Sequence, residues 1–149
     1  MRLTSHTDYA LRMLIYMAAR PDELCTVNDV AEAYGLSRNH LVKVAQTLRD
    51  IGFVETTRGR AGGIRLAKTP EAIGIGALVR ATEAEFALAE CMQAEGSDCC
   101  AISPACRLKG MLHEALGAFL AVLDKYTLAD IVRNRAMLGP LLGLSAVAA

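Results

Sequence analysis

The sequence predicts a mostly α-helical fold, a winged helix-turn-helix with a two-stranded wing followed by a long C-terminal dimerisation helix. Three observations predict it: two helical patterns separated by Gly35, a basic glycine-rich turn between two β-prone runs, and apolar residues at helical spacing from Arg107 onward. The order of the first two features is that of a winged helix. We therefore expect a DNA-binding part at residues 1–70, a linking helix and cluster-binding loop at 71–106, and a dimerisation helix with its tail at 107–149.

The first two helices are predicted at residues 7–19 and 27–34. Apolar residues recur at helical spacing in the first, and a proline-aspartate pair follows its end. Either Thr26 or Asn28 can cap the second helix, because both side chains accept a hydrogen bond from a free backbone N–H. Gly35 follows in the position where a left-handed residue commonly ends a helix.

The third helix is predicted to begin after Ser37, as its cap, and to end at Gly52. Its apolar face consists of Leu41, Val44, Leu48 and Ile51. Two β-prone runs follow, at residues 53–57 and 64–66, and they enclose a glycine-rich turn. This pattern predicts an antiparallel hairpin, which forms the wing.

A further helix is expected from Ile73 toward Glu83, and a long amphipathic helix begins at Arg107. Little else in a chain of 149 residues is left to cover so long an apolar face. We expect it to pack against the same helix of a second copy in a twofold homodimer, the alternative being burial within one subunit. A short helix is predicted at residues 127–132, and the tail from Ser145 is expected to fray.

Composition narrows the class of protein. Hydrophobic residues make up 53% of the chain, which is typical of a globular protein with a core. No apolar run reaches the roughly 20 residues that span a bilayer, and no cleavable signal opens the chain, so we expect a cytoplasmic protein without membrane contact. No glycine-rich phosphate loop, nucleophile elbow or acid-base pair is recognisable, and we expect no enzyme activity.

The formal net charge is zero, but the charges are unevenly distributed. Residues 37–68 carry seven basic and two acidic side chains, a net charge of +5 that the rest of the chain balances with −5. This segment contains the third helix and the wing, so we expect it to face DNA phosphates. The candidate DNA-binding residues are Ser37, Arg38, Asn39, His40 and Lys43 in the helix and Arg58, Arg60, Gly62 and Gly63 in the wing.

Each group of candidates has its own physical reason. Donor-rich side chains at the start of the third helix can read base edges in the major groove or hold phosphates, although Ser37 suits a cap better. Wing arginines suit a narrow minor groove, and wing glycines allow positive φ and a close backbone approach. A dimer would require a near-palindromic operator in double-stranded DNA. The alternative is a winged helix that binds protein.

Four of the five cysteines fall within residues 91–106, while Cys25 stands apart and is expected to be buried. In a reducing cytosol such a cluster indicates metal ligands or a redox switch rather than structural disulfides. Eight residues separate Cys91 from Cys100, and five separate Cys100 from Cys106. These gaps exceed the two-residue gap common in zinc sites, so they favour an iron-sulfur cluster, with zinc and a thiol redox switch as alternatives. Three cysteine ligands leave the fourth unassigned.

Four stretches of the chain resemble the Rrf2 family of bacterial winged-helix regulators. They are MRLTSHTDYALR at the start, GLSRNHLVK in the third helix, RGRAGGIRL in the wing and CAISPACRL after the loop. The resemblance is strongest to the nitric-oxide-sensing repressors of the family. It implies a homodimeric transcriptional repressor that carries an iron-sulfur cluster between its DNA-binding heads, with 4Fe-4S favoured over 2Fe-2S. It also implies that nitric oxide, acting on the cluster, causes the repressor to release DNA.

The resemblance also implies the ligand set. Cys91, Cys100 and Cys106 carry over as the cluster ligands, although the first gap is longer than the five residues common in the family. Cys99 is the extra cysteine, and its alternative roles are to replace Cys100 as the middle ligand or to resolve oxidation products. The carboxylate of Asp8 from the second subunit is the implied fourth ligand; its alternative role is to stabilise the first turn of its own helix.

Two other groups of regulators within the family offer alternative assignments for this chain. The iron-sulfur-biogenesis regulators carry a histidine three residues after the third cysteine, where this chain has Lys109. The iron-responsive regulators resemble residues 86–91, whereas residues 37–40 favour nitric oxide. An iron-responsive regulator and a clusterless thiol switch that oxidises Cys99 or Cys100 therefore remain the alternatives.

Overall fold

The computed structural model describes residues 2–21, 23–57, 59, 62–93 and 100–144. Its helices and strands are α1 (Ser5–Ala19), α2 (Val27–Tyr34), α3 (Arg38–Asp50), β1 (Val54–Thr57), β2 (Gly63–Leu66), α4 (Ile75–Thr82), α5 (Arg107–Leu123), α6 (Leu128–Ile131) and α7 (Arg135–Leu141). Short 3-10 helices lie at η1 (Pro70–Ala72), η2 (Glu90–Met92) and η3 (Ser103–Ala105). The predicted mostly helical fold with a two-stranded wing is confirmed.

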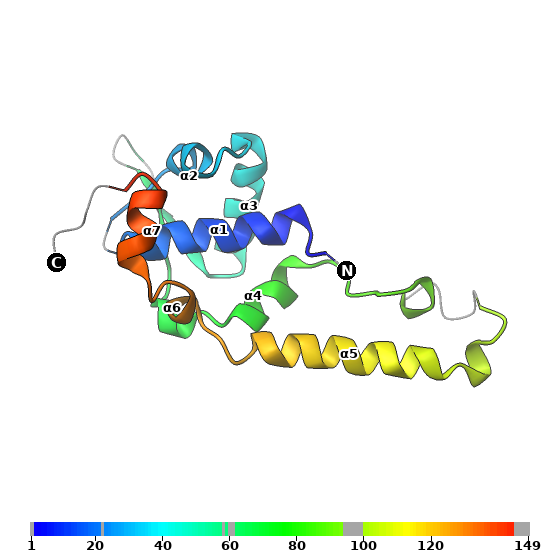
Figure 1. The fold of residues 1–149 in the computed structure, drawn as a ribbon. Helices are drawn as coiled ribbons and strands as arrows, with labels where there is room; N and C mark the ends of the chain where they lie inside the picture. The colour runs from blue at the N-terminus through cyan, green and yellow to red at the C-terminus, as the bar shows by residue number, and fades with distance from the viewer. Residues whose placement is uncertain (1, 22, 58, 60–61, 94–99, 145–149) are drawn as a thin grey trace.

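Helix α1 is the centre of the molecule (Figure 1). It begins at Ser5, two residues earlier than predicted, because Thr4 caps it: the N–H of Thr7 donates to the Thr4 hydroxyl at 3.3 Å. Met13 and Leu14 are fully buried, and the helix contacts α3, α4, α6, α7 and β2. One core therefore joins the N-terminal helices to the C-terminal ones.

The helix-turn-helix forms as predicted, with one difference in its caps. Thr26, not Asn28, caps α2 in a capping box with Asp29, whose N–H donates to the Thr26 hydroxyl at 3.2 Å while the Thr26 N–H donates to its carboxylate at 2.7 Å. Gly35 ends α2 in the left-handed conformation at φ 63°. Ser37 occupies the cap position of α3, but its side chain makes no capping hydrogen bond. Its expected role as a cap is therefore fulfilled in position only.

The wing is a two-stranded antiparallel hairpin in which Val54 pairs with Leu66 and Thr57 pairs with Gly63. A β-bridge between Cys25 and Ile64 attaches this hairpin to the connection between α1 and α2. The backbone N–H of each of these two residues donates to the carbonyl of the other, at 3.0 and 2.7 Å. The wing is thus held to the same core as the helices.

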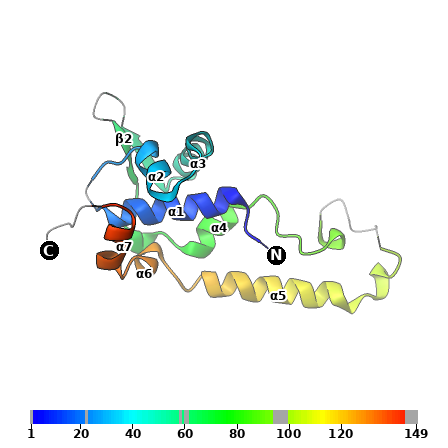
Figure 2. The ribbon, with the colours of Figure 1, turned by 45° about the horizontal axis from the view of Figure 1, so that its top comes forward.

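Helix α5 projects beyond this core with its N-terminal end farthest from it, and residues 83–93 leave the core in the same direction (Figures 1 and 2). The guanidinium of Arg80 on α4 holds Asp124, the C-cap of α5, through two hydrogen bonds of 2.5 and 2.7 Å. No residue of α5 is buried within the chain. None of the helices in the described part of the chain combines the length and the apolarity needed to cross a membrane.

The chain then returns to α1. Leu128 of α6 is fully buried, and its N–H donates to the carbonyl of Ile73 at 2.8 Å. Helix α7, which the sequence patterns did not predict, contains Gly139 and Pro140 and packs Leu138 against the core. Residues that follow the expected dimerisation helix thus share the core of the DNA-binding part.

Candidate DNA interface and cysteine segment

The polar face of α3 is exposed at one surface of the molecule. Its apolar face is buried against α1, with Leu41, Val44 and Leu48 at 1% exposure or less. The exposed residues at its start are Ser37, Arg38, Asn39, His40, Lys43 and Gln46. All five helix candidates are therefore exposed. Gln46, one turn beyond Lys43, was not among the candidates, although its helical spacing placed it on the same face.

Arg38 does not extend freely from this face. Its Nε–H donates to Oδ1 of Asn28 on α2 at 2.7 Å, so the side chain bridges the two helices of the helix-turn-helix. It lines a cavity of about 240 Å³ together with Thr56 and Thr57 of the wing. The terminal N–H groups of a guanidinium held in this way can donate to an anion such as a DNA phosphate. Asn28 was considered from sequence only as a cap.

Only some of the wing candidates belong to the described residues. Arg58 and Arg60 lie outside the described residues. Gly59, at the tip, has φ 116°, a conformation that favours glycine. Gly63 has no positive φ; instead a Cβ there would lie 2.7 Å from the carbonyl oxygen of Cys25. The glycine is needed because two backbones approach closely, and so the positive φ expected for Gly63 is wrong.

His40 is in contact with the first helix. The ring centroids of Tyr9 and His40 are 6.3 Å apart, and both residues line a cavity of about 190 Å³ together with His6 and Lys43. Tyr9 directly follows Asp8 on α1. The first two turns of α1 therefore lie against the start of the helix expected to read DNA.

Three described cysteines belong to the part of the chain that leads from α4 to α5. Cys91 is in η2, Cys106 is the N-cap of α5 and Cys100 lies between them along the chain; all three are free thiols of intermediate exposure. Cys99 lies outside the described residues. Within the described ranges, no group of three His, Cys, Asp or Glu side chains is gathered to hold a metal ion.

These donors fit an iron-sulfur cluster in kind. Such clusters are held by cysteine thiolates, and three free cysteines lie in this part of the chain. The fit is chemical and not geometric, since the three thiols must still come together. Cys25 does not fit: it is 1% exposed, and burial, aided by Asp29, raises its thiol pKa to about 11. It is buried, as expected.

Asp8 is held by an ion pair within its own chain. The guanidinium of Arg12, one turn further along α1, meets both oxygens of the Asp8 carboxylate at 3.1 and 2.9 Å. Both side chains remain about two-fifths exposed. The single chain does not unite Asp8 with the cysteines in one metal-binding group among the described residues.

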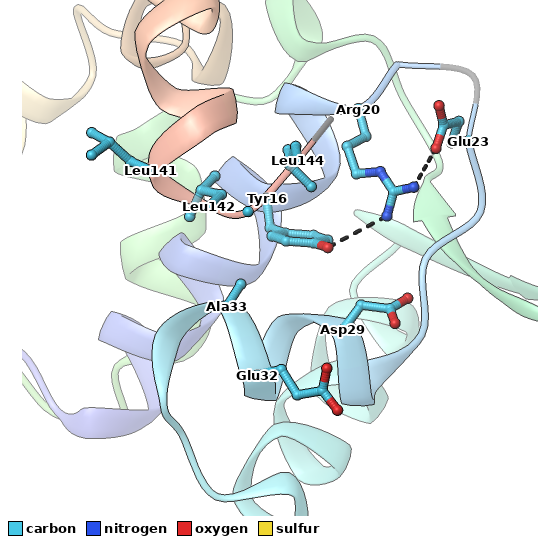
Figure 3. A pocket seen from close by; sticks show the side chains of 10 residues that line it. Tyr16, Arg20, Glu23, Asp29, Glu32, Ala33, Leu141, Leu142 and Leu144 are labelled. Atoms are coloured by element: carbon cyan, nitrogen blue, oxygen red, sulfur yellow. Dashed lines mark hydrogen bonds and ion pairs between the residues drawn. The ribbon is translucent and has the colours of Figure 1, made fainter. Parts of the chain in front are cut away.

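A cavity of about 630 Å³ lies on the other side of α1, between α2 and residues 141–144 (Figure 3). Three of its four charged groups are already engaged. Arg20 pairs with Glu23 and donates to the Tyr16 hydroxyl at 3.4 Å, while Asp29 belongs to the capping box of α2. These groups stabilise the ends of α1 and α2, so we assign the cavity no part in the site.

Known proteins resemble this chain over most of its length. The profile of the Rrf2 family, described as an iron-dependent transcriptional regulator, matches residues 3–134. The HTH-type transcriptional regulator NsrR of Bacillus subtilis (strain 168) is 55% identical over 136 residues, 91% of this chain and 92% of the relative. NsrR of Halalkalibacterium halodurans is 52% identical over 145 residues, covering 97% and 99% of the two chains. Among solved structures, CymR, the global cysteine regulator of B. subtilis, matches with a TM-score of 0.72 at 25% identity, covering 90% and 98%.

Proposed function

Because the chain belongs to the Rrf2 family of transcriptional regulators, we propose that it is a repressor that senses nitric oxide through an iron-sulfur cluster. The chain is a DNA-binding regulator and not an enzyme. The observation that carries the proposal is the joint presence of an exposed polar face on α3 and three free thiols in the part of the chain that leads from α4 to α5. A helix suited to bind DNA and a set of thiol ligands suited to iron thus occur in one small protein, which acts in the cytoplasm.

On the DNA side, α3 enters the major groove. Asn39, His40 and Lys43 reach base edges, with Ser37 beside them, because these exposed donors share the outer face of the helix. Arg38, turned toward Asn28, contacts a phosphate at the edge of the groove. In the wing, Arg58 and Arg60 enter the minor groove, and Gly62 and Gly63 let the hairpin backbone approach the DNA.

The functional unit is a homodimer that pairs through α5. Leu108 and Met111 on this helix are 58% and 64% exposed, and Val122 near its other end is 50% exposed. Removing such a face from water is favourable at about 25 cal/mol for each Å² of apolar surface. A second copy of the same helix matches it in length and chemistry, and a twofold dimer reads a near-palindromic operator.

Cys91, Cys100 and Cys106 of one chain would hold the cluster, and the carboxylate of Asp8 would come from the other subunit. The cluster, of 4Fe-4S rather than 2Fe-2S type, supplies iron to which nitric oxide binds. Asp8 serves as a ligand only when its ion pair with Arg12 opens, since the pair engages both carboxylate oxygens. A carboxylate is a harder donor than thiolate, so Asp8 would be the weakest of the four ligands.

The same arrangement explains how the signal reaches DNA. Asp8 lies on α1, which is packed against α3 in the core. Holding Asp8 therefore fixes α1, and with it the position of the reading helix in each half of the dimer. When Asp8 is released, the population of dimers with correctly spaced reading helices falls, and the apparent DNA affinity falls by the same fraction.

The test begins with protein purified without oxygen, whose iron, sulfide and visible absorbance are measured. DNA selected from a random pool by this protein is then used to follow binding by fluorescence anisotropy while nitric oxide is added. We expect a coloured, iron-containing dimer that releases DNA as nitric oxide is added. A colourless, iron-free protein that binds the DNA and ignores nitric oxide would overturn the proposal.

A matched pair of variants tests the role of Asp8. Asp8→Ala and Arg12→Ala both lose the ion pair, but only the first loses the carboxylate. Asp8→Ala is expected to release DNA at a lower dose of nitric oxide than wild type, while Arg12→Ala is not. Equal doses for Asp8→Ala and wild type would exclude the bridging role. Release by iron chelation alone would instead support the iron-responsive alternative, and release by thiol oxidation of iron-free protein would support the thiol switch.

A further inference from the structure

Two threonine side chains are buried where α1 meets the end of α4. Thr7 is 0% and Thr82 is 9% exposed, and they are the buried polar side chains of the described core. The Thr7 hydroxyl donates to the Thr82 hydroxyl at 2.9 Å, and the latter donates to the carbonyl of Leu78 at 2.9 Å. Two apolar groups of the same shape can fill such a place at little cost in stability. The hydroxyls therefore contribute direction and register to this contact more than they contribute stability.

A second contact lies beside the first. The N–H of Thr4, the N-cap of α1, donates to Oε1 of Glu83 at 2.7 Å, and its hydroxyl donates to the same oxygen at 3.1 Å. Glu83 is the C-cap of α4 and the residue from which the chain leaves toward Cys91. The start of α1 is thus hydrogen-bonded to Glu83, the first residue of the cysteine segment, which is the part of the chain from residue 83 to residue 106.

The same two turns of α1 contact the reading helix on another side. Tyr9 lies against His40, with ring centroids 6.3 Å apart. Residues 4–9 therefore touch the base of the cysteine segment through Thr4 and Thr7 and the start of α3 through Tyr9. The contacts on both sides come from one short stretch of helix.

We propose that Thr4, Thr7, Thr82 and Glu83 form a joint that transmits the position of the cysteine segment to α3. The inference rests on the proposed function, because it explains how ligand binding at the cysteines moves the reading helix. Hydrogen bonds have preferred directions, so a shift of residue 83 pulls the first turn of α1 with it. An apolar contact in the same place has no such preferred direction. Tyr9 then carries the shift to His40.

The first test uses cluster-free protein, so that it is independent of the loaded state. The protein has three histidines, and the C2 proton of each gives a separate NMR signal. Thr82→Val, which removes the hydroxyl but keeps the side-chain shape, is expected to shift the His40 signal because Tyr9 moves relative to it. The signal of His113, which is exposed on α5, is expected to stay in place. An unchanged His40 signal would overturn the joint.

The second test measures coupling. The ratio of DNA affinities between cluster-loaded and cluster-free protein is determined for wild type, Thr7→Val, Thr82→Val and the double variant. Coupling between two sites typically amounts to about 5- to 150-fold, and we expect each single variant to lose most of this ratio and the double variant to lose no more. Thr7→Ser, which keeps the hydroxyl, is expected to retain it.

Controls separate coupling from stability. Val79→Ala removes a fully buried side chain from the same helix without touching the hydroxyls. If it lowers the ratio as much as Thr82→Val does, the threonines are merely structural and the joint is wrong. Should the valine variants fail to fold, Glu83→Ala is expected to lower the ratio and Glu83→Gln, which keeps an acceptor oxygen, to preserve it.

The outcomes also distinguish the two proposals. A wild-type ratio well above one together with unchanged variants would refute the joint and leave the proposed function intact. A wild-type ratio of one would refute both, since there would be no signal to transmit.

Discussion

Arg38 offers the sharpest test of how this protein holds DNA. The residue types in the third helix left open whether it reads a base or holds a phosphate. In the structure its Nε–H is already donated to Asn28, which leaves the end of the guanidinium at a cleft beside Thr56 and Thr57. An arginine that reads guanine usually uses its fork for two hydrogen bonds to one base edge. The bond to Asn28 leaves both terminal nitrogens of Arg38 for such an edge or for a phosphate, and because they end at the cleft beside the wing, we predict a phosphate contact.

The expected magnitude follows from counterion release. Each phosphate contact contributes a slope of about −0.9 to the dependence of log K on log salt, and a dimer carries two copies of Arg38. Arg38→Ala is therefore expected to flatten the slope by about 1.8. Between about 50 and 200 mM salt, wild type loses about twelvefold more affinity than the variant does. The variant binds more weakly at low salt and approaches wild type as salt rises.

The assay is fluorescence anisotropy at several salt concentrations, with the selected duplex and with a scrambled duplex of the same composition. Arg38→Ala is expected to weaken both complexes by the same factor. Arg49→Ala is the matched control, since Arg49 lies at the other end of α3 with its guanidinium 2.8 Å from Asp50. A loss confined to the selected duplex, with an unchanged salt slope, would show that Arg38 reads a base and that the reasoning from Asn28 is wrong.

Two further predictions concern the core that supports the site. Gly63→Ala places a methyl group 2.7 Å from the Cys25 carbonyl oxygen. We expect it to lower the free energy of unfolding in urea by about 1–3 kcal/mol and to weaken DNA binding. Gly139→Ala, whose added methyl group has its nearest neighbour at 4.0 Å, is the control and is expected to change neither quantity. Burial raises the pKa of Cys25 from 9.0 to about 11, so its contribution to stability is complete below pH 9.0 and is lost as the pH rises through the folded value. At about pH 10 the free energy of unfolding of wild type is expected to be about 1.4 kcal/mol lower than below pH 9.0 for this reason. Cys25→Ala is expected to lack this decrease. An equal decrease in both proteins would exclude Cys25 as its source.

Local signals in the sequence were enough to predict much of the fold. The turn at Gly35 and the hairpin around the glycine-rich tip follow from backbone preferences that act over a few residues, and the structure has both. Helix α7 was missed because Gly139 and Pro140 are poor helix formers, and burial of Leu138 against α1 overrides that preference. The positive φ expected for Gly63 was wrong because the close approach of Cys25 is a tertiary contact that no local pattern encodes.

The candidate site was predictable in its residue types more than in its contacts. Helical spacing alone placed Arg38, Asn39, His40 and Lys43 on an exposed face. The link from Arg38 to Asn28 and the pairing of Asp8 with Arg12 depend on side-chain geometry, which residue spacing does not determine. Thr7 and Thr82 are separated by 75 residues, and nothing in either local pattern indicates that the two hydroxyls meet in the core.

The position of α1 explains how so small a protein can change its DNA affinity without a hinge between domains. α1 is central to one core that includes residues of α3, the wing, α4 and α6, so these elements cannot swing as separate bodies. A close-packed core transmits a displacement instead of absorbing it. The first two turns of α1 carry Asp8, the hydrogen bonds to Thr82 and Glu83, and the contact of Tyr9 with His40. If the proposed function holds, we expect a small shift at these turns to change the spacing of the two reading helices in a dimer. Because both half-sites must be met together, the loss of affinity would be larger than the shift alone suggests.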